Sequence, residues 1–391
     1  MAEAIDTLRG QTSQPQTQPP QRNAQAERAA ADRLSVATQW QLMWWRFRKH
    51  KLAMLAAVIV AFFYTVVLFA DFFAYAQPSE SDAQLSLLTP QPIRWFDGDE
   101  FRPHVYGISG KRDPRTLRRV YAPDPENKIS VTFFTEGYEY KLFGLIPTNR
   151  HLLGLDGARP EEAMFLMGTD LQGRDLFSRL MIATRTSLTI GLVGVALSLF
   201  LGILLGGISG LYGGLVDNVI QRIIEILRSI PTIPLWMALA AAMPSQWPIT
   251  RIYFFITLII ALIGWTTLAR VVRGRFLSLR EEDFVTAAEL AGASKLRIIF
   301  RHMVPSFLSH IIAATTLALP AMIIAETSLS FLGLGLRAPA VSWGVLLQQA
   351  SNIQAVASTP WLLLPAAPVI VAVLAFNFLG DGLRDAADPY G

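Results

Sequence analysis

The sequence predicts an all-α polytopic membrane protein with six transmembrane helices and a small β-containing insertion between the first two. Hydrophobic residues make up 52% of the 391-residue chain and charged residues only 16%, too few to cover a surface that faces water. The apolar residues gather in blocks of about 20, the length that a helix needs to cross a bilayer. A long segment with strand-like runs and many prolines separates the first two blocks.

Six spans follow from these blocks, and four of them carry no charged residue. The fifth contains Pro320 and Glu326, and the proline either permits a kink that helps gating or is simply tolerated. The predicted spans cover residues 52–70, 187–211, 219–243, 252–269, 307–331 and 361–379.

The positions of the basic residues orient these spans. Lys and Arg are dense before the first span and between the fourth and fifth spans, whereas the connections after spans three and five each hold a single Arg. Because short cytoplasmic segments carry the excess of Lys and Arg, both termini and residues 270–306 are predicted to be cytoplasmic. Residues 71–185 then lie on the opposite side of the membrane.

The segments outside the spans are also distinctive. Residues 1–34 are rich in Gln, Ala and Pro and predict a disordered cytoplasmic tail. The first apolar block begins too late for a cleaved leader, so we expect it to stay as an anchor. Residues 35–51 predict an amphipathic helix in the membrane interface. The insertion, 71–185, predicts a hairpin that turns at Glu136-Gly137, and the alternative is a loosely ordered connection.

Residues 281–304 predict two short cytoplasmic helices. Acidic residues open the first helix, where the helix dipole favours them, and alanines leave little bulk on its surface. Gly292 can adopt the positive φ that ends this helix, and Ser294 can cap the second. A helix with so little bulk can lie deep in a groove of another protein. The alternative is an ordinary connecting helix.

The stretch DFVTAAELAGASKLRIIFRHMVPS, residues 283–306, resembles the E-A-A loop of bacterial ABC-importer permeases, and more narrowly the peptide/nickel (dipeptide and oligopeptide) permease family. Three further stretches support this resemblance in the same order along the chain: GTDLQGRD (168–175), GLYGGLVDNVIQRIIEILRSIP (210–231) and AETSLSFLGLGLRAPAVSWG (325–344). The resemblance implies the type I importer permease fold, with residues 186–391 as the permease core, and the second-type permease subunit in the bacterial inner membrane.

The resemblance also implies a function and partners. The chain would form a heterodimeric pore with a sister permease, driven by two cytoplasmic ABC ATPase subunits and supplied by a periplasmic solute-binding protein. ATP-driven alternating access would then import a di- or oligopeptide, or alternatively an oligosaccharide such as an α-galactoside, an opine or nickel.

Two groups of residues take expected roles, the first by the same resemblance and the second from residue type and position in the chain. The first would contact the ATPase, and it has Thr286 where the family pattern begins with Glu: Asp283, Thr286, Ala287, Ala288, Glu289, Gly292, Arg297 and Pro305. The second would serve structure, docking or gating: Gly168, Asp170, Gly173, Arg174, Asp175, Pro320 and Glu326. Glu326 either makes a polar contact with the sister subunit or the outer gate, or lies at the boundary in contact with periplasmic water.

The sequence argues against catalysis by the chain itself. It contains no phosphate-binding G-x-x-x-x-G-K-[ST] motif, so partner subunits would bind and hydrolyse the ATP. It has no cysteine, and its five histidines show no metal-ligand spacing, so neither a cofactor nor a metal is expected. The basic residues follow topology rather than a nucleic-acid site. Two other hypotheses stay open: a membrane-anchored enzyme or sensor that uses residues 71–185, and a self-sufficient channel.

Overall fold

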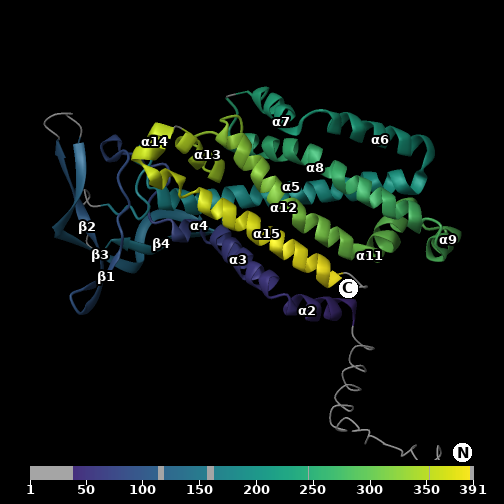
Figure 1. Ribbon diagram of the computed structural model, residues 1–391, viewed down its shortest axis with the longest axis horizontal. Helices are drawn as coiled ribbons and strands as arrows, with labels where there is room; N and C mark the ends of the chain where they lie inside the picture. The colour runs from purple at the N-terminus through teal and green to yellow at the C-terminus, as the bar shows by residue number, and fades with distance from the viewer. Residues whose placement is uncertain (1–37, 113–118, 156–162, 245, 352, 388–391) are drawn as a thin grey trace, which may run out of the picture.

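The computed structural model describes residues 38–387 except 113–118, 156–162, 245 and 352. The predicted disordered tail, 1–34, lies outside the described residues. The helices form an elongated bundle that carries a β-sheet at one end, as Figure 1 shows. We call this the sheet end, and we call the opposite end, where helix α9 (Asp283–Leu290) lies, the α9 end.

Five helical segments among the described residues are long and apolar enough to cross a membrane. They are α3 (Lys51–Leu68), α5 (Leu176–Tyr212), α8 (Ile249–Leu279), α12 (Leu308–Phe331), and the short helix η4 (Pro360–Leu363) together with α15 (Ala366–Ala387). These positions confirm the predicted polytopic fold. Helix α5 begins at Leu176 rather than at Ser187, because the Asp175 side chain accepts a hydrogen bond from Ser178 N and caps the helix there.

The predicted third span, 219–243, is not one continuous helix. Helix α6 (Gly214–Ser229) and helix α7 (Thr232–Ala241) meet at an angle of 87°, so the pair is a broken span or a re-entrant segment. The cause is Pro231, which forces the residue before it out of the helical region. Ile230 accordingly has an extended backbone, with φ −87° and ψ 130°.

Helix α5 lies at the centre of the bundle and contacts α3, α8 and α12, while α15 packs on α3 and α12 (Figure 1). One buried apolar cluster joins α3, α5 and α15 to the segment after α12, and it includes Phe63, Leu180, Trp343 and Phe376. A second cluster fills the space between α5, α8 and α12. These two clusters involve the first half of α5, and a third cluster, which includes Ile203 and Leu211, packs its other end against α8 and η2.

The insertion folds as a four-stranded antiparallel sheet in the order β1-β2-β3-β4. The strands are β1 (Arg94–Asp97), β2 (Glu100–Arg112), β3 (Arg119–Leu142) and β4 (Ile146–Leu155). The predicted β-containing insertion is therefore confirmed, and the alternative of a loosely ordered connection is wrong.

The predicted hairpin turn at Glu136-Gly137 is also wrong. Strand β3 continues through these residues with an irregular register, and the chain turns only after Leu142. Gly137 serves a different purpose, because a Cβ at this position would lie 2.6 Å from the ring of His151 on β4. The glycine thus admits a cross-strand neighbour instead of reversing the chain.

The shorter elements gather at the two ends of the bundle. Helix α2 (Gln39–Lys49) covers most of the predicted amphipathic segment 35–51 and lies at the α9 end with the last turn of α15. The chain from α9 into α12 also lies there: α10 (Lys295–Arg297), the π-helix η2 (Ile298–Met303) and α11 (Val304–Ser306). The other short elements belong to the sheet end: α4 (Ala70–Phe73), η1 (Ala83–Leu85), α13 (Trp343–Gln348), η3 (Gln349–Ser351) and α14 (Ile353–Ser358).

Candidate functional site

Helix α9 starts and ends much as the sequence suggests. Glu282 occupies the N-cap position with an extended backbone, and Asp283 places negative charge in the first turn. Beyond Ala291 the chain leaves the helix at Gly292, which has φ +76°. A Cβ at Gly292 would meet no atom within 4 Å, so within this chain the glycine is required by its backbone conformation and not by close packing.

The inner side of α9 belongs to the core. Val285 is only 1% exposed and packs in one apolar cluster with Phe276 of α8 and Met303 of η2. Ala288 packs against the same cluster. The structure therefore turns Ala288 toward its own chain, although the sequence analysis grouped it with the residues that contact the ATPase.

The outer side of α9 is apolar and uncovered. Phe284, Ala287, Leu290 and Ala291 are exposed, and their spacing places them on one side of the helix. We call these four residues the α9 face. Leu290 is 86% exposed and Phe284 is 40% exposed. A patch of large apolar side chains in contact with water marks a surface that another molecule covers.

The other residues expected to contact an ATPase differ in whether they already have a partner within this chain. Glu289 forms an ion pair with Lys295, which closes the turn around Gly292 within the chain. Thr286 Oγ1 lies 3.5 Å from the backbone oxygen of Glu282. Arg297 and Pro305 are exposed, on α10 and α11 respectively. Glu289 and Arg297 are the two residues expected to make polar contacts with an ATPase. Glu289 already has an ionic partner in this chain, whereas Arg297 is exposed on the surface.

An ion pair that the sequence analysis did not single out ties three helices together near the α9 end. Arg273 of α8 donates from Nε and Nη2 to the two carboxylate oxygens of Asp217 on α6, each at 2.5 Å. Ser209 of α5 donates to Asp217 Oδ1, also at 2.5 Å. A bidentate Arg–carboxylate pair is strong and directional, so it holds α6 in a fixed position on α5 and α8. The available signal was an acidic residue in the stretch GLYGGLVDNV, followed by arginines at the end of the next span.

The turn 168–175 lies at the sheet end, before α5. Gly168 and Gly173 both have positive φ, +75° and +73°. A Cβ at Gly173 would lie 1.8 Å from the carbonyl oxygen of Asp82, and a Cβ at Gly168 would lie 2.4 Å from that of Leu88. Both glycines therefore satisfy a left-handed backbone and a close contact with the loop that follows α4.

Asp170 organises the inside of this turn. Its side chain has no exposed surface and accepts hydrogen bonds from Gln172 N at 2.8 Å and from Arg174 N at 3.0 Å. Arg174 Nε donates to the second carboxylate oxygen at 2.7 Å. Gln349 of η3 also donates to that oxygen, at 3.2 Å. This arrangement uses both oxygens of the carboxylate for structure and leaves no free base.

Asp175 links the same turn to the segment after α4. It caps α5 through Ser178 N at 2.6 Å, and its other oxygen accepts a hydrogen bond from Tyr75 OH at 2.8 Å. Burial raises the pKa of Asp175 to about 6, although these hydrogen bonds oppose the shift. Burial together with the neighbouring Asp175 charge raises the pKa of the Tyr75 hydroxyl well above its usual range.

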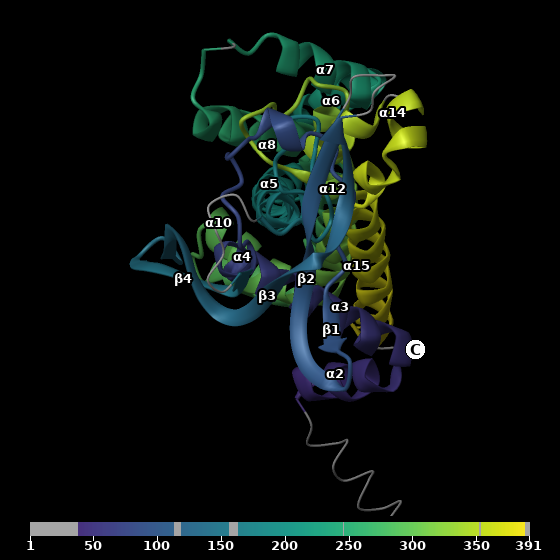
Figure 2. The ribbon, with the colours of Figure 1, turned by 90° about the vertical axis from the view of Figure 1, so that its left-hand side faces the viewer.

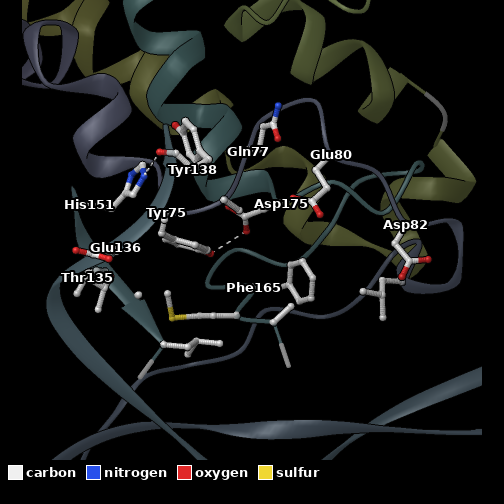
Figure 3. A pocket seen from close by; sticks show the side chains of 18 of the residues that line it. Tyr75, Gln77, Glu80, Asp82, Thr135, Glu136, Tyr138, His151, Phe165 and Asp175 are labelled. Atoms are coloured by element: carbon white, nitrogen blue, oxygen red, sulfur yellow. Dashed lines mark hydrogen bonds between the residues drawn. The ribbon is translucent and has the colours of Figure 1, made fainter. Parts of the chain in front are cut away.

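A cavity of 420 Å³ lies between this turn and the sheet. Figure 3 shows side chains that line it, among them Tyr75, Tyr138, His151 and Asp175. The two ring nitrogens of His151 are bound to the carbonyl oxygens of Asp71, at 2.9 Å, and Tyr138, at 3.0 Å. Both nitrogens therefore lie against the backbone of this chain. Among the described residues there is also no group of three or more His, Cys, Asp or Glu that could hold a metal.

Glu326 lies in a buried network inside the chain. Its carboxylate accepts hydrogen bonds from Ser187 of α5 and Ser330 of α12, both at 2.8 Å, and the side chain has no exposed surface. Ser187 Oγ in turn accepts a hydrogen bond from Trp343 N at 3.1 Å. The carboxylate is thus shielded from water, which does not agree with the interpretation of Glu326 as a boundary residue in contact with periplasmic water.

Pro320 is buried inside the continuous helix α12.

Comparison with known proteins shows the family to which this chain belongs. Residues 202–390 match the family described as binding-protein-dependent transport system inner membrane component, and residues 38–90 match the N-terminal transmembrane domain of oligopeptide transport permease C. Over 236 residues the chain is 40% identical to the oligopeptide transport system permease protein OppC of Escherichia coli, which covers 60% of this chain and 76% of that protein. The chain belongs to this permease family.

Other relatives of the permease agree with this assignment. OppC of Haemophilus influenzae is 39% identical over 236 residues, 60% of this chain and 73% of its own. OppC of Bacillus subtilis is 36% identical over 236 residues, 60% of this chain and 75% of its own. A solved structure of the MetNI methionine ABC transporter in inward-facing conformations covers 53% of this chain and 96% of its own, with a TM-score of 0.40 and 19% identity.

Family membership settles the broad role. The permease is the membrane component of a binding-protein-dependent ABC importer, which also requires an ATPase and a binding protein. The hypotheses of a membrane-anchored enzyme or sensor and of a self-sufficient channel are therefore wrong. Residues 91–201, which include the sheet, lie between the two matched ranges.

Proposed function

We propose that the permease imports oligopeptides across the inner membrane as one half of a heterodimeric pore. The names of three of its relatives, oligopeptide permeases from three organisms, support this solute class. The other half of the pore is a sister permease, two cytoplasmic ATPase subunits drive the cycle, and a periplasmic binding protein delivers the peptide. An oligosaccharide, an opine or nickel is the alternative cargo.

The α9 face is the observation that carries the mechanism. An exposed phenylalanine and an exposed leucine next to two alanines form an apolar surface, which can enter a cleft on an ATPase subunit. The basic residues of α2 and of the end of α8 gather at the same end of the molecule, which supports a cytoplasmic location for this end and for both termini.

Force applied to α9 would reach the spans through packed contacts. Val285 is buried against the end of α8 and against η2, which continues through α11 into α12. The pair Asp217–Arg273 holds α6 and α5 to α8 at this end, whereas Glu326 joins α5 to α12 near the other. Closure of the ATPases would therefore move α8 and α12 together, and the polar contacts on α5 would guide that movement between inward-open and outward-open states.

A bulky residue on the α9 face tests this proposal. Ala287→Trp projects from an exposed position, so the permease itself should fold, but the docked helix should no longer fit its cleft. Ala357→Trp is the matched control, because Ala357 is an exposed alanine of α14 at the sheet end. We expect Ala287→Trp to lose copurification with the ATPase subunits and peptide-stimulated ATP hydrolysis, and the control to keep both. Normal assembly and hydrolysis with Ala287→Trp would refute the docking proposal.

The cargo needs a separate experiment. A strain that lacks the permease should fail to grow on single di- or oligopeptides as a nutrient source and should recover with the intact gene. If the strain still grows on peptides but loses growth on an α-galactoside, an opine or a nickel-limited medium, the peptide proposal is wrong while the permease assignment stands.

The sheet is the proposed docking region for the binding protein. It lies at the end opposite to the α9 face, outside the matched family ranges. Deletion of residues 90–153 should leave membrane insertion intact but weaken binding of the receptor protein to the assembled importer. Unchanged receptor binding by the truncated permease would contradict this role.

A further inference from the structure

The tip of the β3–β4 hairpin is apolar and exposed. Residues 142–147, Leu-Phe-Gly-Leu-Ile-Pro, carry no charged or polar side chain. Leu145 is 81% exposed, Ile146 57% and Phe143 52%. Phe143 and Gly144 both have positive φ, 54° and 74°, so the chain reverses tightly and projects these side chains outward. A water-facing hairpin normally carries polar residues at its turn.

The tip lies beside the point where the first span ends. The ring of Phe143 packs edge-on against the ring of Phe69, with centroids 5.4 Å apart, and Phe69 is the C-cap residue of α3. Phe72 of α4 packs against Phe69 at 6.5 Å and against Phe134 of β3 at 6.1 Å. An aromatic cluster thus joins the end of a membrane-spanning helix to the hairpin.

The β3–β4 hairpin projects sideways from the helix bundle, the direction in which a membrane surface would run. Figure 1 places β4 next to α4, at the level where α3 ends along the long axis of the bundle. Figure 2, which views the molecule from the sheet end, shows the β3–β4 hairpin projecting sideways past α4 and away from the helices. A hairpin that leaves the bundle sideways at this level runs along the bilayer surface and not into the periplasm.

We propose that residues 142–147 insert into the outer leaflet of the bilayer, at the boundary between headgroups and acyl chains. Aromatic side chains concentrate at this depth, and Leu and Ile next to them bury in the upper acyl region. Lys141, the only charged residue between 140 and 149, can reach the lipid phosphates from the start of the turn. The contact continues the lipid-facing surface of α3 and would fix the height and tilt of the sheet over the pore.

The absence of cysteine from the chain makes a direct test possible. Leu145→Cys, labelled with a nitroxide, is incorporated as the full-length permease into nanodiscs of phosphatidylethanolamine and phosphatidylglycerol. The collision rates of the label with oxygen, which prefers lipid, and with a water-soluble nickel chelate are then compared. Phe62→Cys, an exposed position within α3, gives the lipid reference, and Asp99→Cys, in the β1–β2 turn, gives the water reference.

We expect the ratio of oxygen to nickel collisions at position 145 to exceed that at position 99 several-fold and to lie nearer the value at position 62. Ile146→Cys, the second reporter, should give the same result. A ratio equal to that of Asp99→Cys would overturn the proposal. So would protection from both reagents that appears only when the sister permease is present, because the tip would then be a contact between proteins.

Discussion

Replacing Gly173 with alanine should separate the turn 168–175 from the loop that follows α4. The change has two costs. A non-glycine residue at φ +73° loses about 1–2 kcal/mol in the left-handed region. The added Cβ would also lie 1.8 Å from the carbonyl oxygen of Asp82, so the backbone has to shift, and such overpacking costs about 1–3 kcal/mol more.

Gly98→Ala provides the matched control for this prediction. Gly98 has φ +62°, but a Cβ there would meet no atom within 4 Å, so its replacement carries the conformational cost alone. Thermal unfolding of the two full-length variants in detergent should therefore show a clearly larger loss of stability for Gly173→Ala. Limited proteolysis should cut its loop at 77–88 faster than in Gly98→Ala. Equal loss of stability in the two variants would refute the close contact on which the reasoning rests.

Three further predictions concern buried carboxylates. Asp175 has a pKa of about 6 in the folded protein against an ordinary value of 3.8, so the folded state binds this proton more tightly. Stability should therefore fall by up to about 3 kcal/mol as the pH rises from about 4 to about 6 and stay lower above that range, and Asp175→Asn should remove this part of the pH dependence of thermal unfolding. Asp217→Asn leaves Arg273 without its ionised partner, so it should lower the free energy of unfolding by about 1–3 kcal/mol and also reduce coupled ATP hydrolysis. Glu225→Gln, in an exposed pair on the same helix, should lower the free energy of unfolding by less than about 1 kcal/mol. Equal losses in the two variants would contradict the role of the Asp217 pair. Glu326→Leu should lower the free energy of unfolding by about 1–3 kcal/mol more than Glu326→Gln does, because the Ser187 and Ser330 hydroxyls lose their acceptor. Thermal unfolding of the two variants in detergent would measure this difference.

Hydropathy and charge predicted the architecture because they depend on local sequence. The apolar blocks located five spans, and the long gap between the first two blocks located the insertion. Helix α12 begins within one residue of the predicted start of the fifth span. The break between α6 and α7 within the predicted third span was missed because average hydropathy ignores the effect of Pro231 on the residue before it.

Contacts between distant residues set the remaining features. Gly137 suggested a turn because Glu136-Gly137 lies between two strand-like runs, yet its role depends on His151, which lies on the neighbouring strand. Glu326 could not be placed from the sequence, since its partner Ser187 lies 139 positions away. The pairing of Asp217 with Arg273 is of the same kind, as it joins residues 56 positions apart.

Coverage of the α9 face by an ATPase subunit is the central element of the proposed mechanism. Leu290→Cys provides the most direct measurement, because this side chain is 86% exposed in the isolated chain and the protein contains no other cysteine. The rate at which a water-soluble maleimide labels it would be measured in the permease pair with and without the ATPase subunits, and Ala357→Cys at the sheet end would serve as the control. We expect the ATPase subunits to slow labelling at position 290 many-fold and to leave the labelling rate at position 357 unchanged. Equal labelling of Leu290→Cys in both states would contradict it.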